Sequence, residues 1–276
     1  MKKSVLVMAA ALSLTACNQA TKPAEEVQEP KSLVLYYSLT ETTTKVAEEF
    51  AKQTGADIVA FDLKEPYSKV YDEAIQRSMK DREEGVIPEL DSLKVDLSAY
   101  QTIYLGFPIW FGTYATPVKS LLAAVDLSGK KVVPFATFGS GGRNVAEADL
   151  KKALPNADVT EAFGIRQANV EKAPAAIKAF LLKNGLVEGE YVALPEFSEL
   201  QDVTEEQKAI FNEATGSYSM LHATPLKVAT RTIEEGTEFK YTAEDQGRDG
   251  QKSEITIYVV KPAAEGQPAY FTEVVR

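Results

Sequence analysis

The sequence predicts an α/β fold, a doubly wound parallel sheet of five strands, followed by a smaller α+β unit. Three observations predict it. Apolar runs of strand length alternate with helix-length segments as far as Gly185. These runs carry almost no charge, as strands buried on both faces do. After Gly185 the pattern changes to one helix followed by four strand-like runs. We therefore place the first domain at residues 32–186 and the second at residues 187–276.

The first strand and helix enclose a turn that is rich in hydroxyl groups. The strand is expected at Leu33–Tyr37, and a turn at Ser38–Thr44 leads into a helix that ends at Gly55. A strand end followed by a helix start places hydroxyls, backbone N–H groups and the positive end of the helix dipole at one point. The turn is therefore a candidate anion site. The alternative is an ordinary strand–helix connection with threonine caps.

The other elements of the first domain follow in alternation. We expect strands at 58–63, 102–107, 131–138 and near 162–165, and helices at 72–84, 117–125, 145–154 and 174–184. Pro108 is expected to close the third strand.

Ligands of such sheets bind beyond the carboxyl ends of the strands. Besides Ser38–Thr44, two unusual loops leave these ends. Residues 108–114 hold the only tryptophan, Trp110, which we expect in a turn rather than in a core element. Residues 139–142 contain three glycines, so that backbone can approach a ligand closely. An anion site, a flat aromatic side chain and a bare backbone loop suit a phosphorylated planar ring.

Residues 32 to about 185 resemble flavodoxins, in particular a bacterial branch with the motif Gly-Phe-Pro-Ile-Trp-aromatic-Gly, here Gly106–Gly112. The phosphate loop of that family, Ser-x-Thr-Gly-x-Thr, is similar to the segment that starts at Ser38. The resemblance implies noncovalently bound FMN, with its phosphate on the first loop and its isoalloxazine between the other two, stacked on Trp110. The cofactor-binding residues that it implies are Ser38, Thr40, Thr42, Thr43, Pro108, Ile109, Trp110, Phe111, Gly112, Thr137, Gly139, Ser140, Gly141 and Gly142.

One residue departs from the family pattern, because Glu41 stands where flavodoxins have glycine. A carboxylate ~4 Å from a phosphate would cost about 4 kcal/mol at an effective dielectric near 20, and about 1 kcal/mol in water. FMN binding therefore requires Glu41 to face solvent. If its carboxylate instead occupies the phosphate position, the domain is a binding module that has lost FMN.

The N-terminus is typical of a bacterial lipoprotein signal. Lys2 and Lys3 precede a short apolar segment, and Leu14-Thr15-Ala16-Cys17 resembles a lipobox. We expect residues 1–17 to be the signal, with Cys17 lipidated, and residues 18–31 to be a flexible tether. The expected location is the cell envelope, with the membrane reached through the lipid anchor. Cys17 is the only cysteine, so no internal disulfide is possible.

Composition limits the partners. A chain that begins at Cys17 has 28 basic and 40 acidic residues, a net charge of about −12. This charge disfavours binding to the backbone of a nucleic acid, and none is expected as a partner. No cluster of His and Cys suggests a transition-metal site, and the only histidine, His222, is expected to be an exposed polar residue in a turn.

The second domain is expected to pack one helix across a four-stranded antiparallel sheet. A capping box at Thr204–Gln207 opens the helix, and the strands are predicted at 226–233, 237–243, 254–260 and 270–275. Residues 207–241 resemble a cystatin. Of the Gln-x-Val-x-Gly wedge with which cystatins enter a cysteine protease, only Gly236 remains in Thr232–Gly236. We therefore expect a cystatin-like domain that serves docking or stability, with protease inhibition as the alternative.

The function expected from these observations is electron transfer by FMN on an exported, lipid-anchored protein. No residue of the chain is predicted to be catalytic, because the flavin carries the chemistry. An FMN-dependent NAD(P)H oxidoreductase is the enzymatic alternative. We prefer the electron carrier because nicotinamide cofactors are not expected outside the cytoplasm and no second nucleotide motif is present. The redox partner is not identified by the sequence.

Overall fold

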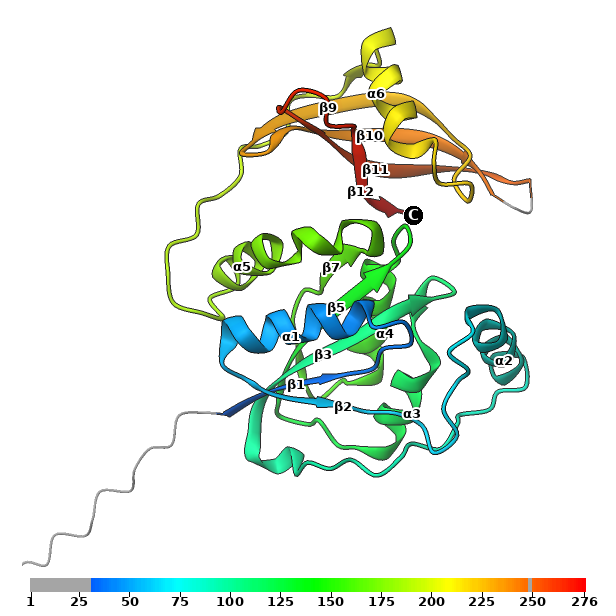
Figure 1. The fold of residues 1–276 in the computed structure, drawn as a ribbon, viewed down its shortest axis with the longest axis vertical. Helices are drawn as coiled ribbons and strands as arrows, with labels where there is room; N and C mark the ends of the chain where they lie inside the picture. The colour runs from blue at the N-terminus through cyan, green and yellow to red at the C-terminus, as the bar shows by residue number, and fades with distance from the viewer. Residues whose placement is uncertain (1–30, 248–249) are drawn as a thin grey trace, which may run out of the picture.

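The computed structural model describes residues 31–247 and 250–276. The predicted signal with Cys17, and the predicted tether up to residue 30, lie outside the described residues. The described chain forms two sheets (Figure 1). The first sheet has a hydrophobic core on each face, and the second sheet has a core of its own. Within these residues, no helix is both long and apolar enough to cross a bilayer.

The first sheet is parallel and confirms the predicted class. Its strand order is β2-β1-β3-β5, with β6 and β7 both beside β5. β7 is the predicted last strand, and the two-residue β6 was not predicted. The short β4 pairs antiparallel with the end of β3. The direction of winding reverses between β1 and β3, which is where such sheets bind ligands. The bounds are β1 Lys31–Tyr36, β2 Asp57–Ala60, β3 Tyr100–Trp110, β4 Thr113–Tyr114, β5 Lys131–Phe138, β6 Asp158–Val159 and β7 Phe163–Arg166.

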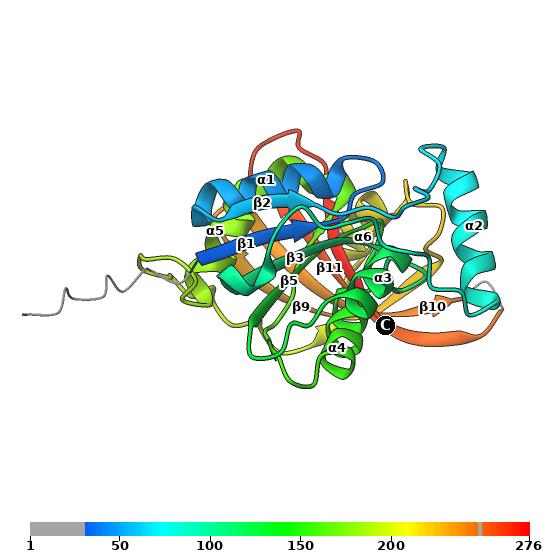
Figure 2. The same cartoon turned by 90° about the horizontal axis from the view of Figure 1, so that it is seen from below.

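Helices cover both faces of this sheet because successive strand residues point to opposite faces. In β1, Val34 packs with α1 and α5, whereas Leu33 and Leu35 pack with α3 and α4. Figure 2 shows α1 on one side of the sheet and α3 and α4 on the other, with α2 lying apart. The helices are α1 Thr42–Thr54, α2 Tyr71–Glu83, α3 Thr116–Ala124, α4 Arg143–Ala153 and α5 Ala173–Lys183, with 3₁₀ turns η1 at Leu97–Ala99 and η2 at Gln167–Lys172.

The second domain has the predicted architecture with one strand added. The predicted capping box is present, since Thr204 and Gln207 each accept a hydrogen bond from the other's backbone N–H. Phe211 of α6 packs on Tyr241 of the sheet. The antiparallel order is β12-β11-β10-β9-β8. The bounds are β8 Gln201–Asp202, α6 Glu205–Thr215, β9 Ala223–Ile233, β10 Gly236–Gln246, β11 Lys252–Pro262 and β12 Tyr270–Val275.

The last strand joins the two domains. In Figure 1, the C-terminal end of β12 reaches the loop that follows β5. There the Val274 N–H donates to the Ser140 carbonyl at 2.7 Å. Arg143 at the start of α4 makes two hydrogen bonds to the Glu273 carboxylate, at 2.8 and 3.1 Å. Burial by itself lowers the pKa of Arg143, but the paired Glu273 outweighs it and the pKa is raised. The second domain is therefore fixed to the carboxyl-end edge of the first sheet.

Candidate functional site

The first loop connects β1 to α1 at the edge where ligands bind. The Ser38 hydroxyl accepts the Thr44 N–H at 3.3 Å and so caps the first turn of the helix. Glu41 precedes the helix with φ 62° and ψ −7°, the left-handed conformation that glycine adopts most easily. Its side chain is exposed to solvent. Glu41 thus adopts a backbone conformation that suits glycine, at the position where the family pattern has glycine.

Two buried threonines join this loop to the centre of the sheet. Thr43 and Thr137 are 2% and 4% exposed, and their hydroxyl oxygens lie 2.8 Å apart in a hydrogen bond. Thr137 lies near the end of β5, so this bond fixes the start of α1 against the third loop. The two hydroxyls belong to different sequence motifs that the fold brings together.

The predicted site residues line two adjoining cavities. The smaller, about 150 Å³, lies between the first loop and the end of β3. The larger, about 680 Å³, lies between the second and third loops. Tyr71, Ile109 and Gly139 line both, so the cavities meet. Of the fourteen predicted residues, only Ser38 lines neither. The smaller is lined by Thr40, Thr42, Thr43, Pro108, Ile109, Trp110, Thr137 and Gly139, and the larger by Ile109, Phe111, Gly112, Gly139, Ser140, Gly141 and Gly142.

The sequence placed Trp110 in a turn outside the core, and this prediction is wrong. Trp110 is the last residue of β3, is 5% exposed, and meets Tyr37 and Tyr67 edge-on at centroid distances of 5.9 and 5.4 Å. The strand also continues past Pro108, whose carbonyl accepts the Ala115 N–H. Trp110 still lines the smaller cavity. Its stacking on a flavin stays a prediction.

The exposed aromatic ring of the second loop is Phe111. Trp110 pairs with Thr113, so Phe111 and Gly112 form a two-residue hairpin between β3 and β4. Both have positive φ, 51° and 83°, as the hairpin turn that matches strand twist requires. Phe111 is 42% exposed, and the Arg82 guanidinium lies 4.7 Å from its ring centroid. The turn therefore presents a flat ring at the mouth of the larger cavity.

The glycines of the third loop are approached by the protein itself. A Cβ at Gly141 would lie 1.9 Å from the Val274 carbonyl oxygen, and one at Gly139 would lie 3.0 Å from the Tyr218 hydroxyl. Gly142 has φ 105°, and a Cβ there would meet Ile109 at 2.7 Å. The absence of side chains at Gly139 and Gly141, which was expected to let a ligand approach, also allows residues of the second domain to pack against this loop.

Two buried phenols, those of Tyr37 and Tyr67, contact Trp110 in the wall of the smaller cavity. Burial, followed by the hydrogen bond to Asp81, raises the pKa of Tyr67. Burial, followed by the negative charge of Asp62, raises that of Tyr37. Both phenols stay protonated at ordinary pH. Among the described residues, no group of His, Cys, Asp and Glu could hold a metal ion.

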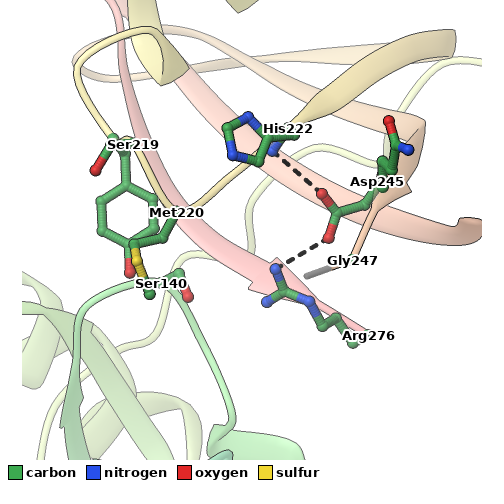
Figure 3. A pocket seen from close by; sticks show the side chains of 9 residues that line it. Ser140, Ser219, Met220, His222, Asp245, Gly247 and Arg276 are labelled. Atoms are coloured by element: carbon green, nitrogen blue, oxygen red, sulfur yellow. Dashed lines mark hydrogen bonds and ion pairs between the residues drawn. The ribbon is translucent and has the colours of Figure 1, made fainter. Parts of the chain in front are cut away.

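Several lining residues were missed by the sequence analysis. Tyr71 begins α2, and Gln167 begins η2. Six others are close in sequence to the predicted residues, namely Leu39, Thr113, Phe138, Asn144, Val145 and Asp149. Four belong to the second domain: Tyr218, Met220, Val274 and Arg276. No local sequence signal marks these four, because their place depends on how the domains dock. His222, correctly expected to be exposed, lines a third cavity beside them, of about 320 Å³ (Figure 3).

Comparisons with known proteins agree with the fold. The flavodoxin family model matches residues 31–178, somewhat more than half of the chain. The chain is similar to a solved Bacteroides eggerthii protein assigned as a flavoprotein, at 27% identity and a TM-score of 0.50, over 57% of this chain and 99% of that one. A protein of Bacteroides uniformis with the same assignment has 29% identity, coverages of 54% and 98%, and a TM-score of 0.49. A Lactobacillus acidophilus flavoprotein in complex with FMN is 22% identical, with a TM-score of 0.45, over 52% of this chain and 97% of that one. No curated protein matches.

The match extends from β1 into α5 and includes all three loops and the reversal of strand order. The second domain lies beyond it. FMN is the cofactor of this family. The chain belongs to the flavodoxin family.

Proposed function

We propose that this protein binds FMN noncovalently and transfers electrons through it, while a lipid on Cys17 holds it at the cell envelope. The observation that carries the redox proposal is the junction of the two cavities. One is lined by the hydroxyl-rich loop and the other by the two loops that the family uses for the flavin ring. A phosphate and a flat ring joined by a short chain need two such adjoining spaces.

The residues of the smaller cavity fit a phosphate. Thr40, Thr42 and Thr43 supply hydroxyl donors, and the thirteen-residue helix α1 begins among them with its positive dipole end. The exposed Glu41 does not line this cavity. This geometry supports FMN binding over the alternative of a module that has lost its cofactor.

The residues of the larger cavity fit a flat aromatic ring. Ile109 and Phe111 give it apolar side chains, and Gly139–Gly142 supply backbone groups. Bound flavin supplies one-electron and hydride chemistry, while protein groups set its orientation and electronic properties. Here β3 and β5 are paired up to Pro108 and Thr137, so the two loops start from a fixed base.

The second domain is proposed to dock on the first domain rather than to inhibit a protease. In the cystatin resemblance, the β9–β10 hairpin would have to enter a protease. The Glu235 carboxylate of this hairpin instead accepts hydrogen bonds from Lys172 of the first domain at 2.6 Å and from Tyr270 at 2.8 Å. A hairpin tip held in this way supports the docking role.

A visible absorbance spectrum of the purified protein, before and after FMN is added and free FMN removed, tests the redox proposal. We expect a retained flavin spectrum that changes on reduction. A protein that retains no flavin contradicts it. Papain inhibition assays test the protease alternative, and we expect no inhibition.

The anchor has its own test. Cys17→Ser should abolish labelling by a fatty acid and release the protein from membranes. A single acyl chain binds membranes only weakly, so stable anchoring requires more than one chain. Label that persists in Cys17→Ser contradicts the lipobox interpretation.

A further inference from the structure

The larger cavity has walls from both domains. On one side lie Ile109 and Phe111 of the second loop, with the glycines of the third loop beside them. Tyr218, Met220 and Arg276 of the second domain line the same cavity. The family match ends at residue 178, so it accounts for only the first of these walls.

Tyr218 is held in place by groups of both domains. Its ring meets Phe271 of β12 edge-on at a centroid distance of 5.5 Å. The Arg166 guanidinium lies 3.5 Å from the Phe271 ring centroid and 5.2 Å from that of Tyr218, and its Nε donates to the Gly139 carbonyl at 2.7 Å. Arg166 therefore ties Tyr218 to the third loop.

Arg276 is held by a buried carboxylate. Asp245 is 5% exposed and accepts the His222 backbone N–H at 3.3 Å and the Arg276 guanidinium at 3.2 Å (Figure 3). Ser140 of the third loop lies beside this group in the same view. The cavity lined by Arg276 and His222 shares Ser140, Tyr218 and Met220 with the larger cavity. Arg276 is thus held in place by Asp245, as Tyr218 is by Phe271 and Arg166.

We propose that the second domain completes the ring half of the FMN site, with Tyr218, Met220 and Arg276 as flavin-contacting residues. This inference rests on the proposed function, since it assumes that FMN binds in the two cavities. It adds a role for the second domain: the isoalloxazine lies between two domains rather than on an open edge. The ligand recognised by this wall is a planar, apolar ring with polar substituents at its rim.

Titrating the full-length protein with FMN and with riboflavin tests the proposal, because riboflavin has the ring but lacks the phosphate. Tyr218→Ala and Met220→Ala should each weaken both ligands by the same factor, about five- to tenfold, as loss of a ring contact does. Arg276→Gln should likewise weaken both. Thr42→Ala should weaken FMN and leave riboflavin unchanged.

A control variant separates loss of a flavin contact from loss of domain docking. Lys172→Ala removes the interdomain ion pair with Glu235, but Lys172 lines neither cavity, so both affinities should stay within twofold of wild type. Met220 is 50% exposed, so Met220→Ala keeps the test valid if Tyr218→Ala fails to fold.

The outcomes are distinct. Equal weakening of FMN and riboflavin by the Tyr218 and Met220 variants supports the proposal. Tight wild-type binding that these variants leave unchanged overturns it and leaves the proposed function intact. Tighter binding in the variants also overturns it, because the second domain would then obstruct the ring. A wild-type protein that binds neither ligand overturns both.

Discussion

Replacement of Glu41 by glycine tests how this chain keeps a flavodoxin phosphate loop without the family's glycine. Glu41 has φ 62° directly before α1, and its carboxylate is exposed. Glu41→Gly removes two costs together, the left-handed backbone of a residue with a Cβ and a negative charge near the phosphate. Glu41→Gln removes only the charge, so the two variants separate the costs.

The backbone cost follows from the dihedral angles. The left-handed conformation costs a residue with a Cβ roughly 1–2 kcal/mol. The greater freedom of glycine in the unfolded chain returns about 0.4–1 kcal/mol of this. We therefore expect Glu41→Gly to be more stable than Glu41→Gln by about 0.5–1 kcal/mol. In a domain of this size that difference raises Tm by about 1–4 °C.

The charge cost follows from exposure. A carboxylate in water ~4 Å from a phosphate costs about 1 kcal/mol, and salt screens it. Both variants should therefore tighten FMN by no more than about fivefold at low salt, and by less at high salt.

Urea denaturation of the ligand-free variants and FMN titration at two salt concentrations measure these effects. Equal stability of the two variants would show that the loop is not strained. A gain of about a hundredfold or more in FMN affinity, unaffected by salt, would show that the carboxylate occupies the phosphate position. Either result refutes the reasoning.

Three further predictions concern buried groups of the two domains. Thr137→Val leaves the buried Thr43 hydroxyl without its partner and should lower the free energy of unfolding by about 1–3 kcal/mol. The Thr43→Val/Thr137→Val double variant should recover part of this loss, and strict additivity in urea denaturation would argue against the bond. Trp110 should show the blue-shifted emission of a buried indole, quenched when FMN binds. Trp110→Ala should cost about 3–5 kcal/mol of stability, so Trp110→Phe is the variant for affinity measurements, and red-shifted wild-type emission would contradict the buried placement. Finally, the free energy of unfolding should fall as pH rises above about 10, measured from urea midpoints across that range. Burial raises the pKa of Tyr37, Tyr67, Tyr241 and Tyr270 in the folded state. The unfolded chain therefore loses these protons first, and alkaline pH favours unfolding. A urea midpoint that does not change with pH would contradict the burial of these phenols.

The sequence predicted the sheet because strands buried on both faces leave an unambiguous pattern. Uncharged runs such as Leu33–Tyr37 are typical of strands that helices cover on both sides, and the hydroxyl-rich turn after that run marks the helix start. The positions of α1 and α2 and the capping box of α6 were correct to within a few residues. These features depend on local sequence, which a single chain displays directly.

The misplacement of Trp110 has a local cause. Pro108 predicts the end of the third strand, because proline lacks a donor for the hydrogen-bond ladder. In the structure Pro108 is the last β3 residue paired with β5, where the missing N–H costs little, and the strand goes on to Trp110 through its hairpin with β4. A two-residue strand such as β4 is too short to be recognised from its sequence.

The role of the third loop was only half predicted, for a different reason. Its glycines suggested close approach of backbone to a ligand, and the larger cavity agrees. The closest approach to Gly141, however, is made by Val274, more than a hundred residues away. Contacts between domains depend on the complete fold, so composition and spacing around residues 139–142 could not predict them.

Titration of the purified wild-type protein with FMN tests the central claim most directly, with the emission of the only tryptophan and the visible flavin spectrum followed together. The smaller cavity is lined by Trp110 and by Thr40, Thr42 and Thr43. The account predicts saturable binding of one FMN per chain that quenches Trp110, with weaker binding of riboflavin because the phosphate contacts are lost. Failure of wild type and Glu41→Gly alike to bind FMN would contradict it.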